Sequence, residues 1–436
     1  MKTITPAPSG TPSVAILREA ASTDDHIHLG RGEWLINDQV NLAGARAQHI
    51  TADPEAVVRV VLDGKRAGVL LRDKETPTRL ALPKVVAEGH FGGQEAIIYS
   101  YGVGHLHIHD TNISGVTKGA CISIRATKTA GVQDVLVENC KLYSRASQLG
   151  DREQDDLKTF GVSLNAEIDT GEPHVVPMQY WKTRHVAAGP YQAIASVVIR
   201  NNDIDGGYYG IGCSGVQGSV FDGNRIRNNM RGISLQDGSS YNVVSYNEVE
   251  ENISSGIHLA YGANGNAIRR NSIHSARVQG EGQLQAYVGC NDNRFEGNTV
   301  TATSEHGAKY FAYCAVQSNG NVWEDNLFSG NAARAYFGIE SDWNRTLPQD
   351  YHRGYNTAEG TDFMAGGDMH RISLIRNCVL PATGSRGSIF LLSAVNGYRL
   401  ATVALVQNDF LYNVPKLRKI ETVAGTLTGV VEYGNG

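Results

Sequence analysis

The residues best able to do chemistry occupy one position of a short segment that recurs along the chain, as in GIHL at 256–259. If this segment is a strand, Ile257 and Leu259 point to one face and His258 to the other, because successive side chains alternate. Aligning the later segments predicts two outward columns of polar and aromatic side chains. The first contains Ser234, His258, Gln285, Tyr313 and Glu340, and the second contains Gln236, Tyr287 and Asp342.

One chemistry that these residue types allow is β-elimination at a uronate sugar. The reaction needs a base for the proton beside the carboxylate, a donor to that carboxylate, and an acid for the leaving oxygen. His258 is the candidate base, because a neutral imidazole near pH 7 can take a proton. Gln285 is the candidate donor, and Tyr287 or Tyr313 the candidate acid. Ser234, Gln236 and Tyr261 would add substrate contacts, with tyrosine rings as platforms for sugar faces.

Hydrolysis of a glycosidic bond is the alternative chemistry, and it needs two carboxylates about 5–9.5 Å apart. Glu340 and Asp342 stand two positions apart, roughly 6.5–7 Å by strand rise. A third interpretation is a non-catalytic sugar-binding or structural surface, because the outward positions of any soluble β-protein are polar.

The element that positions these residues is a repeat. The segments VIRNNDI, VFDGNRI, VVSYNEV, AIRRNSI, RFEGNTV and VWEDNLF align on one Asn, followed two residues later by an apolar residue. These residues are Asn202, Asn224, Asn247, Asn271, Asn298 and Asn326, with spacings of 22, 23, 24, 27 and 28 residues. A second polar position opens the next strand, at Ser219, Asn242, Asn266, Asn293 and Asn321.

Each repeat predicts three short strands separated by turns, and such a unit buries its apolar face only by stacking on its neighbours. We therefore expect an all-β fold, a single parallel β-helix of about 12 coils, with the six Asn side chains hydrogen-bonded in a ladder. The weaker segments place Thr111, Cys140, Cys378 and Asp409 on the same ladder. Residues 1–436 would form one domain, with residues 1–30 as the N-terminal cap and first strand.

Two stretches exceed the repeat length and predict long insertions, at about 143–194 and 343–368. Both follow the strand equivalent to GIHL, so we expect the two loops on the same side of the coils. Their aromatic and basic residues are further candidates for substrate binding, namely Trp181, Lys182, Arg184 and Trp343.

The alternation of the GIxL and NxI segments over residues 95–415 resembles the right-handed parallel β-helix of the pectate-lyase-like superfamily. That group includes polysaccharide lyases, mannuronan epimerases, pectin-type glycosidases, fructotransferases and phage tailspikes. The resemblance implies a sugar groove along the outer face of the GIxL strands. It also implies a homotrimer, as in tailspikes and fructotransferases. The chain lacks the Asp-Pro-His signature of the epimerases and the paired Asp motifs of the pectin hydrolases.

Composition excludes several function classes. Charged residues make up 19% of the chain, the formal net charge is −5, and 49 of 436 residues are Gly. These values argue against a nucleic-acid partner and a disordered chain, and no apolar stretch is long enough to cross a membrane. The acidic run DREQDD at 151–156 matches no calcium loop, so calcium is unsupported and no metal or other cofactor is expected. The start MKTITPAPSG is not a secretory signal, and a polysaccharide partner predicts an extracellular or virion-associated protein.

Overall fold

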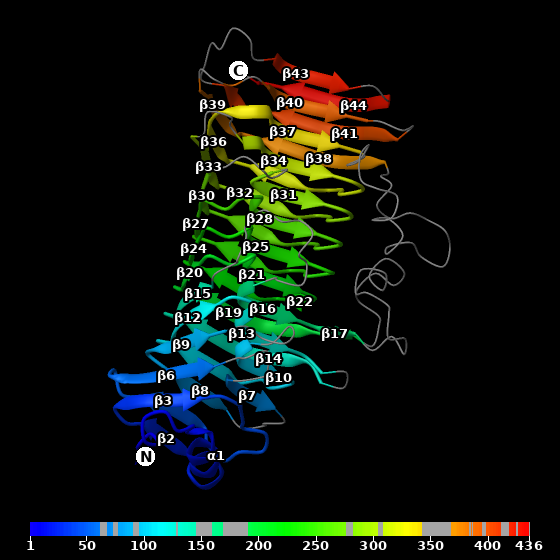
Figure 1. Ribbon diagram of the computed structural model, residues 1–436. Helices are drawn as coiled ribbons and strands as arrows, with labels where there is room; N and C mark the ends of the chain where they lie inside the picture. Colours follow the sequence, from blue (N-terminus) through cyan, green and yellow to red (C-terminus); the bar gives the residue numbers. More distant parts are fainter. Residues whose placement is uncertain are drawn as a thin grey trace. The chain divides into compact units, whose positions relative to one another are not determined.

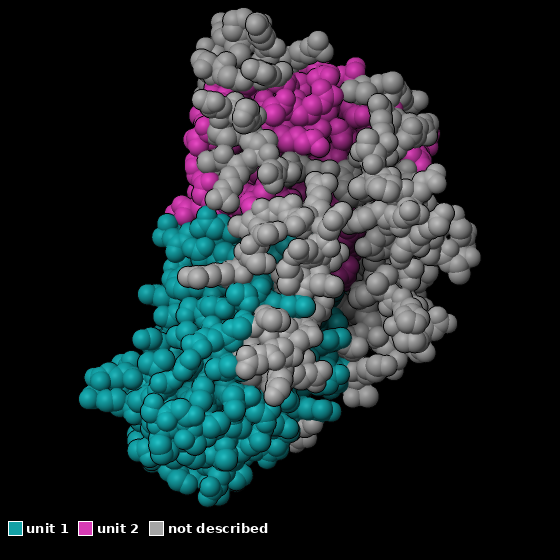
Figure 2. Space-filling model, in the orientation of Figure 1, with its two compact units in different colours: residues 1–169, 191–230 teal, residues 170–190, 231–436 magenta. Residues whose placement is uncertain are grey.

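The structure is a computed structural model that describes fifteen stretches of the chain, which are residues 1–61, 68–72, 77–89, 96–127, 130–144, 159–168, 191–275, 282–303, 308–341, 368–382, 385, 387–394, 398–410, 418–423 and 426–435. Two compact units make up the chain (Figure 2). Unit 1 comprises residues 1–169 and 191–230, and unit 2 comprises residues 170–190 and 231–436. The single domain stays a prediction.

The described residues form three long parallel sheets, in which each strand pairs with the equivalent strands of the coils before and after it (Figure 1). We call them sheets A, B and C, with 16, 13 and 13 strands. Thirteen strands in two of the sheets agree with the expected number of coils. Within a coil the chain visits the sheets in turn, so that side chains facing inward from all three form one stacked core.

In unit 1 the strands of sheet A are β1 (Lys2–Ile4), β2 (His26–Leu29), β5 (His49–Ala52), β8 (Thr78–Ala81), β11 (Leu106–His109), β14 (Val132–Glu138), β19 (Ile194–Arg200), β22 (Val216–Gln217) and β23 (Val220–Asp222). Those of sheet B are β3 (Gly32–Ile36), β6 (Ala56–Val61), β9 (Val85–Glu88), β12 (Asn112–Val116), β15 (Lys141–Ser144), β20 (Asp203–Asp205) and β24 (Arg225–Arg227). Those of sheet C are β4 (Gln39–Asn41), β7 (Gly68–Arg72), β10 (Ala96–Tyr101), β13 (Gly119–Arg125), β16 (Thr159–Asn165) and β21 (Tyr209–Ser214).

In unit 2 the strands of sheet A are β26 (Val243–Ser245), β29 (Ala267–Arg269), β32 (Arg294–Glu296), β35 (Val322–Glu324), β38 (Met369–Ile375), β41 (Arg399–Val406) and β44 (Thr426–Tyr433). Those of sheet B are β27 (Glu248–Glu250), β30 (Ser272–Ser275), β33 (Thr299–Ala302), β36 (Leu327–Gly330), β39 (Cys378–Pro381) and β42 (Asp409–Phe410). Those of sheet C are β25 (Arg231–Gln236), β28 (Ser255–Ala260), β31 (Leu284–Tyr287), β34 (Ala308–Ala315), β37 (Ala332–Glu340), β40 (Ser388–Ser393) and β43 (Arg418–Val423).

A short helix lies at the N-terminal end of unit 1, as expected for residues 1–30. Helix α1 (Val14–Thr23) buries Val14, Leu17, Ala20 and Ala21, and it packs beside β2 and β4. Its apolar stripe thus covers inward-facing side chains of the first coil, which would otherwise face water.

The expected asparagine ladder is present in each unit. In unit 1 the Asn202 amide donates to Oδ1 of Asn224 at 2.9 Å, and the backbone N–H of Cys140 donates to Oδ1 of Asn202 at 2.9 Å. In unit 2 every rung repeats this pattern, through Asn247, Asn271, Asn298, Asn326, Asn377, Asn408 and Asn435. Each amide also donates to a backbone carbonyl, as Asn298 does to Ile268 at 2.8 Å. Except for the partly exposed Asn435, these side chains are buried, so the ladder satisfies turn groups that water cannot reach.

Two of the weaker ladder assignments are wrong by one residue. The ladder side chains are Asn377 and Asn408, whereas Cys378 and Asp409 open the strands that follow. The error came from aligning these segments on VENCKL, where Cys140 is the ladder residue and Asn139 precedes it.

Backbone conformation explains the correct register. The residue before each rung has a positive φ, for example 55° at Asn201, 53° at Tyr246 and 50° at Arg376. The ladder residue therefore follows a left-handed residue and turns its amide into the core. A parallel ladder of buried amides in unit 2 obeys the same rule, and its members are Asn242, Asn266, Asn293 and Asn321.

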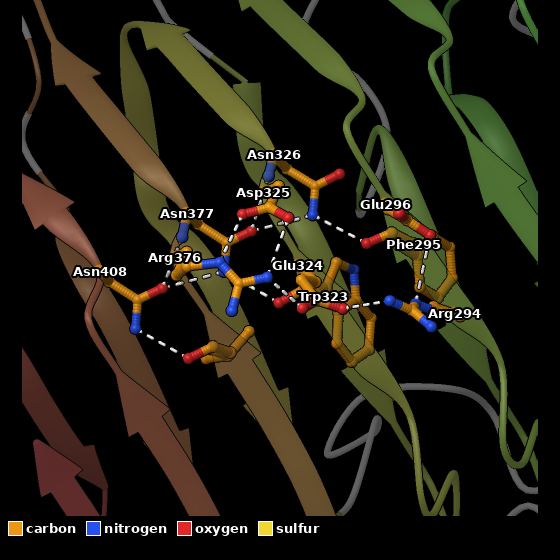
Figure 3. A network of polar contacts seen from close by, with 11 residues as sticks. Arg294, Phe295, Glu296, Trp323, Glu324, Asp325, Asn326, Arg376, Asn377 and Asn408 are labelled. Carbon is orange, nitrogen blue, oxygen red and sulfur yellow. Dashed lines mark hydrogen bonds and ion pairs between the residues drawn. The ribbon is translucent and has the colours of Figure 1, made fainter.

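Charged side chains outside the ladder add contacts between successive coils (Figure 3). Arg376 pairs with Glu324 and also with Asp325, at 2.9 Å, and Arg294 pairs with Glu324. Beneath them the Phe295 and Trp323 rings stack in the core with centroids 4.7 Å apart. The arginines are about half exposed, so each pair is worth at most about 1 kcal/mol, and the buried amides stabilise the stack more.

We expect Asn298→Leu to lower the free energy of unfolding by about 3 kcal/mol or more, because it orphans the Asn271 amide and the Ile268 carbonyl inside the core. Chemical denaturation measures the loss. Ser272→Leu places the same side chain at an exposed position of the preceding coil and should change stability little. Equal stability of the two variants would contradict a ladder role.

Candidate active site on the outer face of sheet C

The first predicted column exists on the outer face of sheet C in unit 2. Strand pairing aligns Ser234 with His258, His258 with Gln285, and Gln285 with Tyr313. Ile257 and Leu259 lie in the core, as expected. Neighbouring residues of this column are therefore about 4.8 Å apart, the spacing of hydrogen-bonded strands.

Glu340 belongs to the second column, which corrects its predicted place. The residue that pairs with Tyr313 is Gly338, and Glu340 pairs with Ala315. The prediction aligned the Gly of GIES with the Gly of GIHL, which put Glu340 beside Tyr313. The strand pairing instead puts Gly338 beside Tyr313, so Glu340 lies two residues further along the strand. Strand β37 ends at Glu340, and Asp342 lies outside the described residues.

The two columns do not form the open surface that was expected of a sugar groove. His258 and Ser234 are 0% exposed, and Tyr287 and Tyr313 are 2% and 1% exposed. On this face large rings pack against small neighbours. We call this packing the tyrosine cluster, which consists of Ala260, Tyr287, Val288, Tyr310, Tyr313, Ala315, Val316, Ala335 and Leu391, with Tyr261 against it.

His258 is held by a polar chain from the preceding strand. Its Nδ1 lies 2.8 Å from Oγ of Ser234, and that oxygen accepts a hydrogen bond from Nε2 of Gln236 at 2.7 Å. When the imidazole donates from Nδ1 to this oxygen, the basic lone pair lies on Nε2, and this is the tautomer that a base requires. Nε2 is buried and has no hydrogen-bond partner among the described residues. An oriented imidazole with a free nitrogen is the arrangement of a general base.

Burial, together with the positive charge of Arg231, holds the pKa of His258 well below its ordinary value. Desolvation disfavours the charged imidazolium, so the ring is neutral at pH 7. A neutral ring can accept a proton, and a lowered pKa makes it a weaker base than a free imidazole.

Tyr287 is the tyrosine beside this base. The rings of His258 and Tyr287 are 5.1 Å apart, and the Tyr287 hydroxyl donates to the Tyr261 hydroxyl at 3.3 Å. Gln285, next to His258 in the column, accepts a hydrogen bond from Ser255 through Oε1 at 3.5 Å. That contact orients the amide and leaves its nitrogen as the donor.

A second group of residues surrounds Glu340. Its carboxylate accepts hydrogen bonds from the hydroxyls of Tyr310 at 3.0 Å and Tyr313 at 2.8 Å. The two rings stack 4.8 Å apart, and they lie against Gly338, where a Cβ would come within 2.8 Å of the Tyr310 ring. Burial, reinforced by the Glu340 charge, raises the pKa of Tyr310. Tyr310 is therefore a neutral donor, and the hydroxyls of Tyr310 and Tyr313 together hold the carboxylate.

The site thus unites some predicted residues and not others. Ser234, Gln236, His258, Gln285, Tyr287 and Tyr261 lie together, and Tyr313 lies with Glu340 further along the face. Tyr310 was expected among the tyrosines near His258 and instead binds Glu340 beside Tyr313. Gly338 was missed, because a residue without a side chain gives no chemical signal in the sequence. Trp181, Lys182, Arg184 and Trp343 lie outside the described residues, as does most of both expected insertions.

No group of three or more His, Cys, Asp and Glu among the described residues could hold a metal ion. The single helix in the described part of the chain is too short to span a membrane. The absence of a cofactor stays a prediction.

Comparison with known proteins supports the architecture. Residues 187–300 match the model of the right handed beta helix region. The chain is a right-handed parallel β-helix. This β-helix is similar to a variant of the catalytic domain of a GH87 α-1,3-glucanase in complex with nigerose, with 11% identity, a TM-score of 0.54, and coverage of 100% of this chain and 69% of the other.

The same GH87 domain without that substitution, also with nigerose, gives 12% identity and a TM-score of 0.51. A further variant bound to tetrasaccharides gives 13% identity and a TM-score of 0.50, and both comparisons cover 100% of this chain and 69% of the other. At these identities the likeness shows the fold alone. No curated protein matches the β-helix in sequence.

The buried His258 predicts an acid-sensitive fold. Because its folded pKa is lowered, its stabilising contribution is complete above pH about 6.5 and declines below it, where the unfolded chain takes up a proton that the folded chain refuses. Between pH 7.5 and 5 the free energy of unfolding should fall less in His258→Asn than in the wild type, by up to about 1.4 kcal/mol per pH unit. Denaturation at both pH values measures it, with the half-buried His274→Asn as control. An unchanged pH dependence in His258→Asn would refute the assignment.

Proposed function

We propose that the protein is a carbohydrate-active enzyme that cleaves an acidic polysaccharide by β-elimination on the outer face of sheet C. The observation that carries the proposal is the buried Nε2 of His258, which has no partner while Nδ1 is held by Ser234. The fold that the chain shares with sugar-bound glucanase domains supports a carbohydrate substrate. This support comes from fold likeness, and fold alone does not decide the reaction.

In this reaction His258 removes the proton from the carbon that bears the uronate carboxylate. The electron pair forms a double bond to the neighbouring ring carbon, and the bond from that carbon to the glycosidic oxygen breaks. Tyr287 donates a proton to the leaving oxygen, and the amide of Gln285 holds the carboxylate. No water is consumed. Tyr287 is favoured over Tyr313 as the acid because it lies against His258. Its hydroxyl donates to a neutral Tyr261 hydroxyl at 3.3 Å, whereas the Tyr313 hydroxyl donates to the Glu340 carboxylate at 2.8 Å.

Since His258 is 0% exposed, the site must open before a polymer can reach Nε2. The substrate would then run across the strands, with tyrosine rings as platforms for sugar faces. An extracellular place of action follows from such a substrate. The homotrimer and the tailspike or virion association stay predictions.

Glycoside hydrolysis is the second candidate, favoured by the glucanase likeness and by the Glu340 carboxylate held between two tyrosine hydroxyls. It needs a second carboxylate within about 5–9.5 Å. On the two columns between β25 and β37, the described residues offer Glu340 alone, and Asp342 is the predicted partner. The non-catalytic interpretation offers no role for the free nitrogen of His258.

His258→Asn should lower kcat for polymer cleavage by about 10²–10⁴-fold, since it removes the general base and can keep the contact with Ser234. The absorbance of unsaturated uronate ends, recorded on a panel of acidic polysaccharides, measures it. His274→Asn serves as the control. If His258→Asn retains activity and Glu340→Gln loses it, the elimination mechanism fails and hydrolysis replaces it.

Tyr287→Phe should lower kcat with little change in KM, because the ring platform survives and the donated proton does not. The matched control is Tyr313→Phe, which removes a hydroxyl bound to Glu340 and should retain elimination. The reverse ranking of the two variants would assign the acid role to Tyr313.

A further inference from the structure

The left-handed residues at the ends of the sheet A strands in unit 2 form two rows, one before each ladder. One row precedes the ladder that starts at Asn247, and its members are Tyr246, Arg270, Gly297 and Asp325. The other row precedes the ladder that starts at Asn242, and its members are Tyr241, Gly265, Asp292 and Gly320. Glycine and short polar residues tolerate this conformation, whereas a bulky ring does so only at a cost in stability. Strand β26 is the described strand with tyrosine at both ends, with φ of 59° and 53°.

Both rings lie on the surface and are held by the next coil. Tyr241 is 72% exposed and Tyr246 is 54% exposed. A Cβ at Gly265 would come within 2.8 Å of the Tyr241 ring, so glycine leaves room for that ring. Tyr246 accepts a hydrogen bond from Nη1 of Arg270 at 2.6 Å, and the guanidinium lies 5.7 Å from its ring centroid.

The surface between the two rings is formed by small side chains and carries positive charge at one end. Val243 pairs with Ala267, and both are small, half-buried side chains on the outer face. Ser245 pairs with the exposed Arg269, next to Arg270. The two tyrosines are five positions apart in the sequence, so they lie up to about 16 Å apart by strand rise.

We propose that Tyr241 and Tyr246 form a second carbohydrate-binding site, which holds a segment of an acidic polysaccharide outside the active site. The rings stack on sugar faces at the two ends, and Arg269 and Arg270 pair with carboxylates of the same chain. Glycine would satisfy the backbone at either position, so the fold does not require these two exposed rings. The polymer class rests on the proposed function, while the site itself is independent of the reaction.

The test uses Tyr241→Gly with Tyr246→Gly, in the His258→Asn background so that the probe is not cleaved. Glycine occupies the same rows at Gly265 and Gly297, so the double variant should fold with an equal or higher melting temperature. Native electrophoresis in gels that contain alginate or polygalacturonate measures Kd. We expect the double variant to bind at least about tenfold more weakly, from the loss of two ring contacts.

Tyr433→Ala is the matched control, because Tyr433 is 67% exposed on β44 and should leave Kd unchanged. An unchanged Kd in the double variant overturns the proposal, as does the absence of binding of either polymer to the parent. Stronger binding of a neutral α-1,3-glucan than of both acidic polymers overturns the acidic ligand class. If the double variant loses binding but the wild type cleaves no polymer, the second site stands and the proposed reaction fails.

Discussion

The fold depends on buried side-chain amides that hydrogen-bond from coil to coil. Each rung of unit 2, such as Asn271 on Asn298, satisfies a backbone N–H of one coil and a backbone carbonyl of another. Turn groups facing the core would otherwise be buried without partners, at a cost of about 1–3 kcal/mol each. The ladder therefore fixes the register of the coils that it joins, and because register decides which side chains face outward, it also fixes the columns of sheet C in those coils.

The active-site geometry follows from that register. Strand pairing brings His258 beside Ser234 on one side and Gln285 on the other, so three residues far apart in the sequence become neighbours. The outer face of the same sheet is covered by tyrosines, and burial keeps the imidazole neutral. A rigid scaffold thus supplies an oriented base in a desolvated place, where electrostatic effects are stronger than in water.

The sequence predicted the fold well, because a repeat displays the same constraint many times. The spacing of Asn247 and its successors predicted the ladder and the three sheets. The site was predicted less well. Alternation indicated that His258 faces outward, but a pattern of single residues carries no information on packing, so the burial of His258 by neighbouring rings was missed. Glu340 was misplaced because its segment was aligned on Gly338, and Cys378 because its segment was aligned on Cys140, so single residues did not define the register.

The most direct test of β-elimination by this β-helix is the fate of solvent oxygen during cleavage. Elimination breaks the glycosidic bond without water, whereas hydrolysis places a water oxygen on one new end. The acidic polysaccharide that the wild type cleaves would be digested in water labelled with heavy oxygen. The masses of the oligosaccharides would then be measured by mass spectrometry, under conditions that limit oxygen exchange at reducing ends. The account predicts unsaturated products that are lighter by one water than hydrolysis products and carry no label. Saturated products with one labelled oxygen per cleavage would contradict it.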